Sequence, residues 1–331
     1  MTTTPAPART PRAVGPDALR LLGLVAIVVG HAVPDPVVRE VIYPWHVAVF
    51  FFLAGYLWKP GRTVADEVGR RWRSLLVPYF AWAAIIAGPL LVFDHVTGSA
   101  DVGDRISGFV HGGTYLLNPY LAYWFLCALF VAAVLYRVLD TLLGGHSTLV
   151  ISALVLPLTF VDDHIATIPY AVGVGGMAIF FVSAGRVVRD HRAWLTRLWP
   201  FALVAGAALV ATGLSKPLNM KAGDWGTPVL SFLVAVLLSA GLLGLSEFVF
   251  RHGGPAWISR AASLGLILVL THAVPLYLTD YDLPRWALLT SALAFGSLMA
   301  YLARHTPALG GSRPVPASQP APEPERTTVN A

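Results

Sequence analysis

The chain has 331 residues, of which 56% are hydrophobic and 12% charged, and its mean hydropathy is +0.66. Soluble domains carry about 25% charged residues, so this composition excludes an ordinary soluble globular protein. Apolar runs recur along nearly the whole chain and are continuous rather than alternating. Continuous runs exclude an outer-membrane barrel and predict an all-α, polytopic membrane protein with about ten transmembrane helices.

The first segment, residues 1–16, is rich in Thr, Pro and Ala and is predicted to be a disordered cytoplasmic N-terminus. A membrane domain is expected over residues 17–305, and the Pro-rich residues 306–331 are predicted to form a disordered cytoplasmic tail. The expected membrane helices cover about 17–33, 43–58, 75–93, 119–139, 147–161, 168–188, 199–214, 227–249, 261–279 and 285–303.

Positive charges are distributed unevenly between the connecting segments. With the N-terminus inside, seventeen Arg and Lys residues fall on the inner side and five on the outer side. This bias predicts a multi-pass protein of the plasma (inner) membrane with both termini cytoplasmic. The net charge of +5 is therefore explained by topology and by contact with membrane lipid, and it does not indicate a nucleic-acid partner.

Two ionisable residues, Arg20 and His31, lie on the first apolar segment, eleven residues apart. Eleven helical steps return a side chain to within about 20° of its starting direction, and they correspond to about 16 Å along the axis. An ionisable residue inside a membrane is costly and is by default a functional candidate. The two aligned side chains therefore predict a functional site along this helix face, which is reached from both ends of the helix.

Two more histidines, His46 and His272, are embedded in apolar sequence and are expected at the same depth as His31, in the outer half of the membrane. Neutral histidine is the side chain best suited to accept a proton from a hydroxyl near neutral pH. The alternative for His46 and His272 is a hydrogen bond to a neighbouring helix. The sequence contains no close ligand pair such as His-x-x-x-His, so no metal site is expected.

A basic cluster, Arg70, Arg71 and Arg73, precedes the third apolar segment. Arginines on the cytoplasmic side commonly fix topology and contact anionic lipid. Guanidinium groups also bind phosphate in a bidentate manner, so the cluster is a candidate polyanion site on the same side of the membrane as Arg20. Asp17 lies three residues before Arg20, a spacing that allows its carboxylate to hold the guanidinium.

These residues together resemble membrane acyltransferase family 3, which includes integral-membrane sugar O-acetylases. An Arg and a His separated by ten residues on the first helix are the family's main feature, and Arg20 and His31 match it. The segment WHVAVFFFLAGY, which contains His46, and the basic stretch RRWRSLLVPYF also resemble family features. The resemblance covers roughly residues 15–305.

The resemblance implies ten membrane helices and transfer of an acyl group, usually acetyl, from cytoplasmic acyl-CoA to a hydroxyl. The implied acceptor is a carbohydrate, a lipid-linked sugar or a secondary metabolite, and acetyl-CoA is the implied donor substrate, with no permanently bound cofactor. His31 and Arg20 would be essential for catalysis, and Arg70, Arg71 and Arg73 would bind acyl-CoA. Asp17, His46 and His272 would support the site or bind the acceptor.

A competing interpretation is a transporter or exporter that uses protonatable histidines, since such a protein would also carry buried His and Arg. It does not account for the basic cluster beside Arg20. A structural membrane scaffold would leave both Arg20 and His31 unexplained. Binding or hydrolysis of a CoA ester discriminates between these classes, because only the enzyme predicts it.

Overall fold

The computed structural model describes residues 14–161 and 163–311 of the chain. Within these residues the regular elements are helices and no strand is present, which confirms the all-α prediction. The helices are α1 Val14–Ala32, α2 Pro36–Ile42, α3 Ala48–Tyr56, α4 Val64–Arg71, α5 Val77–Thr97, α6 Val102–His111, α7 Trp124–Leu143, α8 Ser147–Leu158, α9 Val172–Asp190, α10 Arg192–Ala211, α11 Leu230–Val249, α12 Ala256–Thr271, α13 Ala273–Leu278 and α14 Arg285–Leu302.

Seven helical segments of the described chain are long and apolar enough to cross a membrane. Two of these segments each contain two helices. Residues 64–97 combine α4 and α5, and residues 120–158 combine α7 and α8, which the sequence predicted as two separate spans. The predicted span over 43–58 contains only the nine-residue helix α3. The membrane-protein class is thus confirmed, whereas the number of about ten spans stays a prediction.

The ends of the predicted membrane domain differ slightly from the helix ends. Helix α1 begins at Val14, inside the segment predicted to be disordered, and a short 3-10 helix, Pro307–Leu309, follows the last long helix. The remainder of both predicted disordered segments, residues 1–13 and 312–331, lies outside the described residues.

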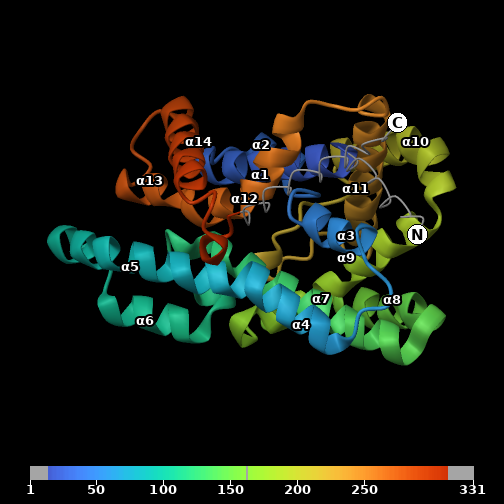
Figure 1. Ribbon diagram of the computed structural model, residues 1–331, viewed down its shortest axis with the longest axis horizontal. Helices are drawn as coiled ribbons and strands as arrows, with labels where there is room; N and C mark the ends of the chain where they lie inside the picture. The colour runs from blue at the N-terminus through green and yellow to red at the C-terminus, as the bar shows by residue number, and fades with distance from the viewer. Residues whose placement is uncertain (1–13, 162, 312–331) are drawn as a thin grey trace, which may run out of the picture.

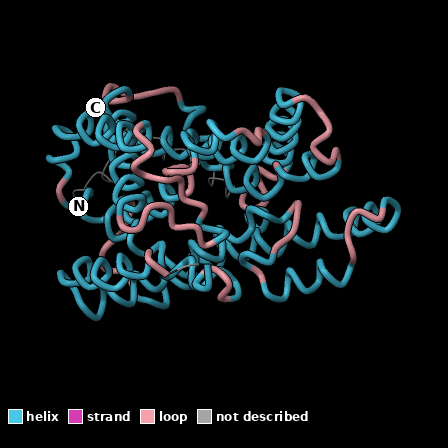
Figure 2. Tube along the Cα trace, turned by 180° about the vertical axis from the view of Figure 1, so that it is seen from behind, coloured by secondary structure: helices cyan, strands magenta, loops and turns pink. Residues whose placement is uncertain are grey.

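Helix α1 occupies an interior position and packs against α11, α12 and α14 (Figure 1). The arrangement places both ends of α1 next to other helices rather than at a free edge. On the opposite face of the molecule, loops and turns cross the middle between the helices (Figure 2). The site described below is enclosed by α1, by α7 and α12, and by one of these loops.

Helices α3 and α9 pack with their backbones almost in contact. A Cβ atom on Gly55 would lie 1.8 Å from the carbonyl oxygen of Val182, and one on Gly185 would lie 1.9 Å from that of Phe52. Membrane helices use small residues in this way because dispersion contacts replace the missing hydrophobic driving force. The close approach fixes α3, whose residues Phe50, Leu53 and Ala54 line the site.

A π-helix, Trp72–Leu76, joins α4 to α5; Arg70 and Arg71 end α4, and Arg73 lies within the π-helix. Pro78 is the second residue of α5 and has no backbone N–H to donate to the preceding turn. The π turn before Pro78 is wider than an α turn and accommodates the missing hydrogen bond. Such π turns occur often at functional sites.

At the far end of α5, a buried polar network ties three elements together. Arg105 of α6 donates to both carboxylate oxygens of Asp94, and the Tyr277 hydroxyl of α13 donates to Asp94 at 2.6 Å. A buried ion pair with these added hydrogen bonds has its lone pairs satisfied, so it holds α5, α6 and α13 in one arrangement.

Candidate active site

Two adjoining cavities lie along α1, and their walls share Phe125 of α7 and Val269 of α12. The first, which we call the histidine cavity, has a volume of about 160 Å³ and is lined by His31. The second, the basic cavity, has a volume of about 530 Å³ and is lined by Arg20. The two ends of one helix therefore each contribute an ionisable side chain to a different cavity.

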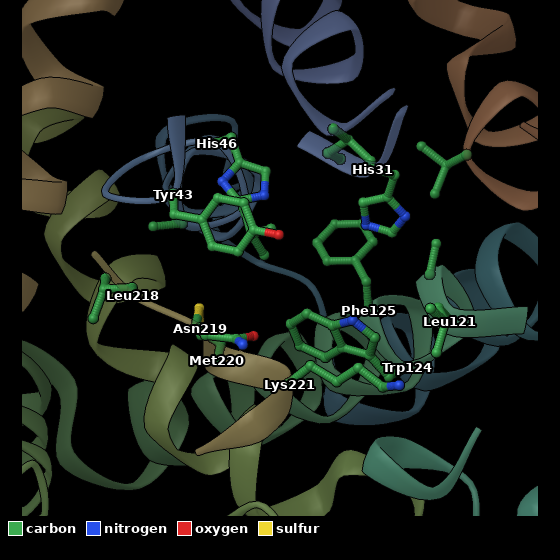
Figure 3. Close-up of a pocket in the computed structure, with 15 residues that line it drawn as sticks. His31, Tyr43, His46, Leu121, Trp124, Phe125, Leu218, Asn219, Met220 and Lys221 are labelled. Atoms are coloured by element: carbon green, nitrogen blue, oxygen red, sulfur yellow. The ribbon is translucent and has the colours of Figure 1, made fainter. Parts of the chain in front are cut away.

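The polar groups of the histidine cavity come from three separate parts of the chain. His31 lies near the end of α1, Tyr43 and His46 lie in the turn before α3, and Asn219 and Lys221 lie in the loop between α10 and α11. Figure 3 shows the Tyr43 and His46 rings on one side of the pocket and the His31 ring on the other. The rest of the wall is apolar: Ile27, Val47, Ala48, Leu121, Ala122, Trp124, Phe125, Leu218, Met220 and Val269.

The three predicted histidines have different hydrogen-bond partners. His46 Nδ1 donates to the carbonyl of Ile42 at 3.0 Å, and His272 Nδ1 donates to that of Val269 at 2.9 Å. A carbonyl only accepts, so both neutral rings carry their proton on Nδ1 and leave Nε2 as an acceptor. His31 has no hydrogen bond to any described residue, which leaves its ring nitrogens available to a molecule in the cavity.

His272 is fully buried and does not line either cavity, but its ring lies beside that of His31 with 5.1 Å between the centroids. The structure thus brings His31, His46 and His272 together, and their common depth in the membrane stays a prediction. His31 and His46 reach the cavity directly, and His272 reaches it only through His31. Among the described residues no group of three His, Cys, Asp or Glu is placed to hold a metal ion.

Among the residues that the structure describes, Lys221 is the only lysine or arginine that lines the histidine cavity. Its ammonium donates to the carbonyl of Leu116 at 3.0 Å, and burial lowers the pKa of Lys221 to about 8. The pKa falls because desolvation penalises the charged form of an amine. A cation held this way next to a small, mainly apolar cavity is well placed to interact with a negative or developing negative charge.

The basic cavity is lined by five cationic side chains and, within the described residues, by no carboxylate. These five are Arg20, Lys59, Arg62, Arg70 and Arg71. Two hydroxyls, Ser74 and Ser263, complete its polar lining. A cavity of this size with an unbalanced positive lining is suited to a polyanion, since guanidinium groups form strong charge-assisted bonds to phosphate.

Glu67 of α4 organises the arginines from behind the cavity wall. Its side chain is fully buried and accepts from Arg70 and, at 2.8 Å, from Nε of Arg71. Arg62 and Arg137 lie 3.6 and 3.7 Å from the same carboxylate. One carboxylate therefore offsets the mutual repulsion of four arginines and fixes their direction.

The other predicted donor-site residues occupy different environments. Arg20 donates to Asp17 at 3.3 Å, which matches the pairing predicted from their spacing. Arg73 lies in the π-helix, is exposed and does not line the basic cavity. Arg70 and Arg71 therefore lie at the site with Arg20, whereas Arg73 does not.

Sequence reasoning did not select several residues of the site. Glu67 was detectable, because Arg70 and Arg71 follow it at spacings of three and four, which place all three on one helix face. Tyr43, Asn219 and Lys221 carry no local signal, since they enter the histidine cavity only through the packing of distant loops.

The fold and the site define a helical membrane protein whose interior places a cluster of cations next to a histidine-lined cavity. Residues 14–303 match a family model described as an acyltransferase domain, and the chain belongs to membrane acyltransferase family 3. It is therefore an acyltransferase. Comparisons with curated proteins and with solved structures gave no match.

Proposed function

We propose that the protein transfers a short acyl group, acetyl in the simplest case, from acyl-CoA to a hydroxyl of a carbohydrate or glycosylated acceptor. The observation that carries this proposal is the adjacency, within the described part of the chain, of a cavity lined by five cations to a cavity lined by His31, which has no hydrogen-bond partner there. A CoA ester has the matching form, with phosphates at one end and a thioester at the other.

The donor would occupy the basic cavity, with its phosphates bound by Arg62, Arg70 and Arg71 and with Arg20 alongside. Arg20 and His31 are separated by about 16 Å along α1, a distance that an extended pantetheine arm covers. The thioester would then reach the junction at Phe125 and Val269, next to His31.

The chemical step requires a base, and His31 supplies it. The acceptor hydroxyl passes its proton to a ring nitrogen of His31 while its oxygen attacks the thioester carbonyl. The carbon–sulfur bond then breaks, and the imidazolium returns the proton to the CoA thiolate. Lys221, in the same cavity, would stabilise the oxyanion that forms at the carbonyl.

The acceptor would enter the histidine cavity, where Trp124 offers an apolar face and Tyr43, His46 and Asn219 offer hydrogen-bonding groups. Aromatic faces with a few convergent polar groups suit the alternating apolar and hydroxyl surfaces of a sugar. The charge bias of the sequence favours an orientation with the basic cavity on the cytoplasmic side of an inner membrane.

The test is release of CoA from acetyl-CoA by the detergent-purified full chain, with and without a panel of simple sugars. We expect turnover that depends on an acceptor and that is lost in His31→Ala and Arg20→Ala. Absence of both turnover and CoA binding would contradict the proposal that acyl-CoA is the donor. A route through a covalent acyl-histidine would instead leave an acylated His31 detectable by mass spectrometry.

A further inference from the structure

Phe125 occupies the boundary between the two cavities. Its side chain lines both of them and is only 8% exposed. Phe50 and Phe51 pack against this ring edge-on, each with 5.4 Å between the ring centroids. Figure 3 shows the Phe125 ring next to that of His31. Contacts on several sides fix the position of the ring, because packed aromatic rings cannot reorient without opening a void.

Val269 of α12 faces the same boundary and is equally constrained. It is 3% exposed, and its carbonyl accepts the Nδ1 proton of His272 at 2.9 Å. The boundary between the cavities is therefore formed by one aromatic and one β-branched side chain, each on a helix held by its neighbours. An atom that crosses this boundary from the basic cavity toward His31 passes these two side chains.

The two cavities differ strongly in size. The histidine cavity has about 160 Å³ against about 530 Å³ for the basic cavity. In the proposed reaction, the smaller cavity has to accommodate both the acyl group and the acceptor hydroxyl. Each methylene added to the acyl group thus competes with the acceptor for the same space.

We propose that Phe125 determines which acyl groups reach His31 and restricts the donor to short-chain acyl-CoA esters. This inference rests on the proposed function, since it takes the donor to be bound with its phosphates in the basic cavity. A longer acyl chain stops at Phe125 and stays in the basic cavity, where it competes for space with the rest of the bound donor. Phe125 is a specificity-determining residue in this scheme and takes no part in proton transfer.

Substitution at Phe125 removes part of this boundary, and α7 offers a control. Phe125→Leu replaces the ring by a smaller, branched side chain, and Phe125→Ala removes the ring altogether. Leu126 is the next residue of α7, is fully buried and lines neither cavity. Leu126→Ala therefore removes a buried side chain from the same helix without changing the lining of either cavity.

The experiment measures the affinity of the full chain in detergent for CoA and for two unreactive thioethers, S-ethyl-CoA and S-hexyl-CoA. We expect the wild type to bind S-ethyl-CoA more tightly than S-hexyl-CoA. In Phe125→Leu and Phe125→Ala the preference should shift toward S-hexyl-CoA by about tenfold or more, the scale set by a few methylenes in an apolar pocket. Leu126→Ala should keep the wild-type ratio.

An unchanged ratio in both Phe125 variants, or a wild type that prefers S-hexyl-CoA, would overturn the role of Phe125 while leaving the donor assignment in place. A wild type that binds neither CoA nor the thioethers would overturn the proposed function itself. The milder Phe125→Leu variant keeps the test decisive if Phe125→Ala does not fold, because truncation of a buried phenylalanine to alanine leaves a destabilising cavity.

Discussion

The imidazole rings of His31 and His272 lie 5.1 Å apart and are tilted by 60° to each other, although they come from opposite ends of the sequence. His272 is fixed by hydrogen bonds from Nδ1 to backbone carbonyls, and within the described residues its buried Nε2 has no partner. The ring beside His31 is therefore held in place, and its Nε2 is a hydrogen-bond acceptor. The ring nitrogens of His31 itself remain open to the histidine cavity. The arrangement favours His31 as the group that exchanges protons.

Replacement of His31 by alanine should lower turnover of acetyl-CoA by about 10²–10⁴-fold, the usual contribution of a well-placed general base. CoA binding should persist, because the basic cavity does not include His31. Turnover and binding are measured on the same purified variant, so a misfolded protein is recognised by loss of both. Turnover close to the wild-type value would contradict the assigned role.

The arginine cluster provides an internal comparison between Arg70 and Arg73. Arg70 lines the basic cavity and Arg73 does not, so Arg70→Ala should raise the KM for acyl-CoA far more than Arg73→Ala. Hydrogen bonds to charged groups contribute about 1.5–3 kcal/mol, which predicts an increase of roughly ten- to a hundredfold for Arg70→Ala. Equal effects of the two substitutions would mean that the donor does not bind in this cavity.

Glu67→Gln should weaken both the fold and donor binding. The substitution keeps the shape of the side chain but leaves the surrounding arginines without their carboxylate, and breaking a buried pair in this way costs about 3–5 kcal/mol. A lower unfolding temperature and a higher KM for acyl-CoA are expected. Asp66→Asn is the control, because Asp66 is exposed and only caps α4 through Thr63, so its loss should leave donor binding unchanged.

Lys221 should make stability depend on pH. Burial lowers its pKa to about 8 in the folded protein from its ordinary value of 10.5. Between these values the unfolded chain binds a proton that the folded chain does not, so this group makes stability rise as the pH rises through that window. The cost of burying the charged amine lowers the stability of the folded protein fully below about pH 8, and this cost is relieved as the pH rises above that value.

Thermal unfolding of Lys221→Met from pH 7 to pH 10 checks this effect. The variant should show a smaller rise in unfolding temperature with pH than the wild type. Lys216→Met, which removes an exposed lysine from the same loop, serves as the matched control. A Lys221→Met profile parallel to that of the wild type would show that the lysine is charged equally in both states.

Local periodicity predicted the features of the site that lie within single helices. The Arg20–His31 relationship followed from the sequence because eleven residues are close to three full turns, and the Asp17–Arg20 pair followed from i,i+3 spacing. Most expected membrane segments coincide with long helices of the structure for the same reason. The expected span 43–58 is an exception, because it contains only the nine-residue helix α3. Close packing against α9 holds this short helix in place.

Features that depend on irregular backbone or on distant loops were not predictable. Arg70 and Arg73 would share one face of a regular α-helix, but the π turn that starts at Trp72 adds a residue to the turn, and Arg73 lies on the outside. Lys221 enters the histidine cavity from a loop whose shape is set by the bridge between Asn219 and Asp224 and by contact with Leu116. No local pattern encodes such placement.

The walls of the two cavities are built from separable parts of the chain. Residues 43–48 and 218–221 contribute to the histidine cavity and none of them contributes to the basic cavity. Exchange of these two short segments would therefore present a new surface to the acceptor without altering the cluster organised by Glu67. Divergence within such a scaffold can proceed by replacing loops at one end, so that a single donor-binding framework serves acceptors of unrelated shape.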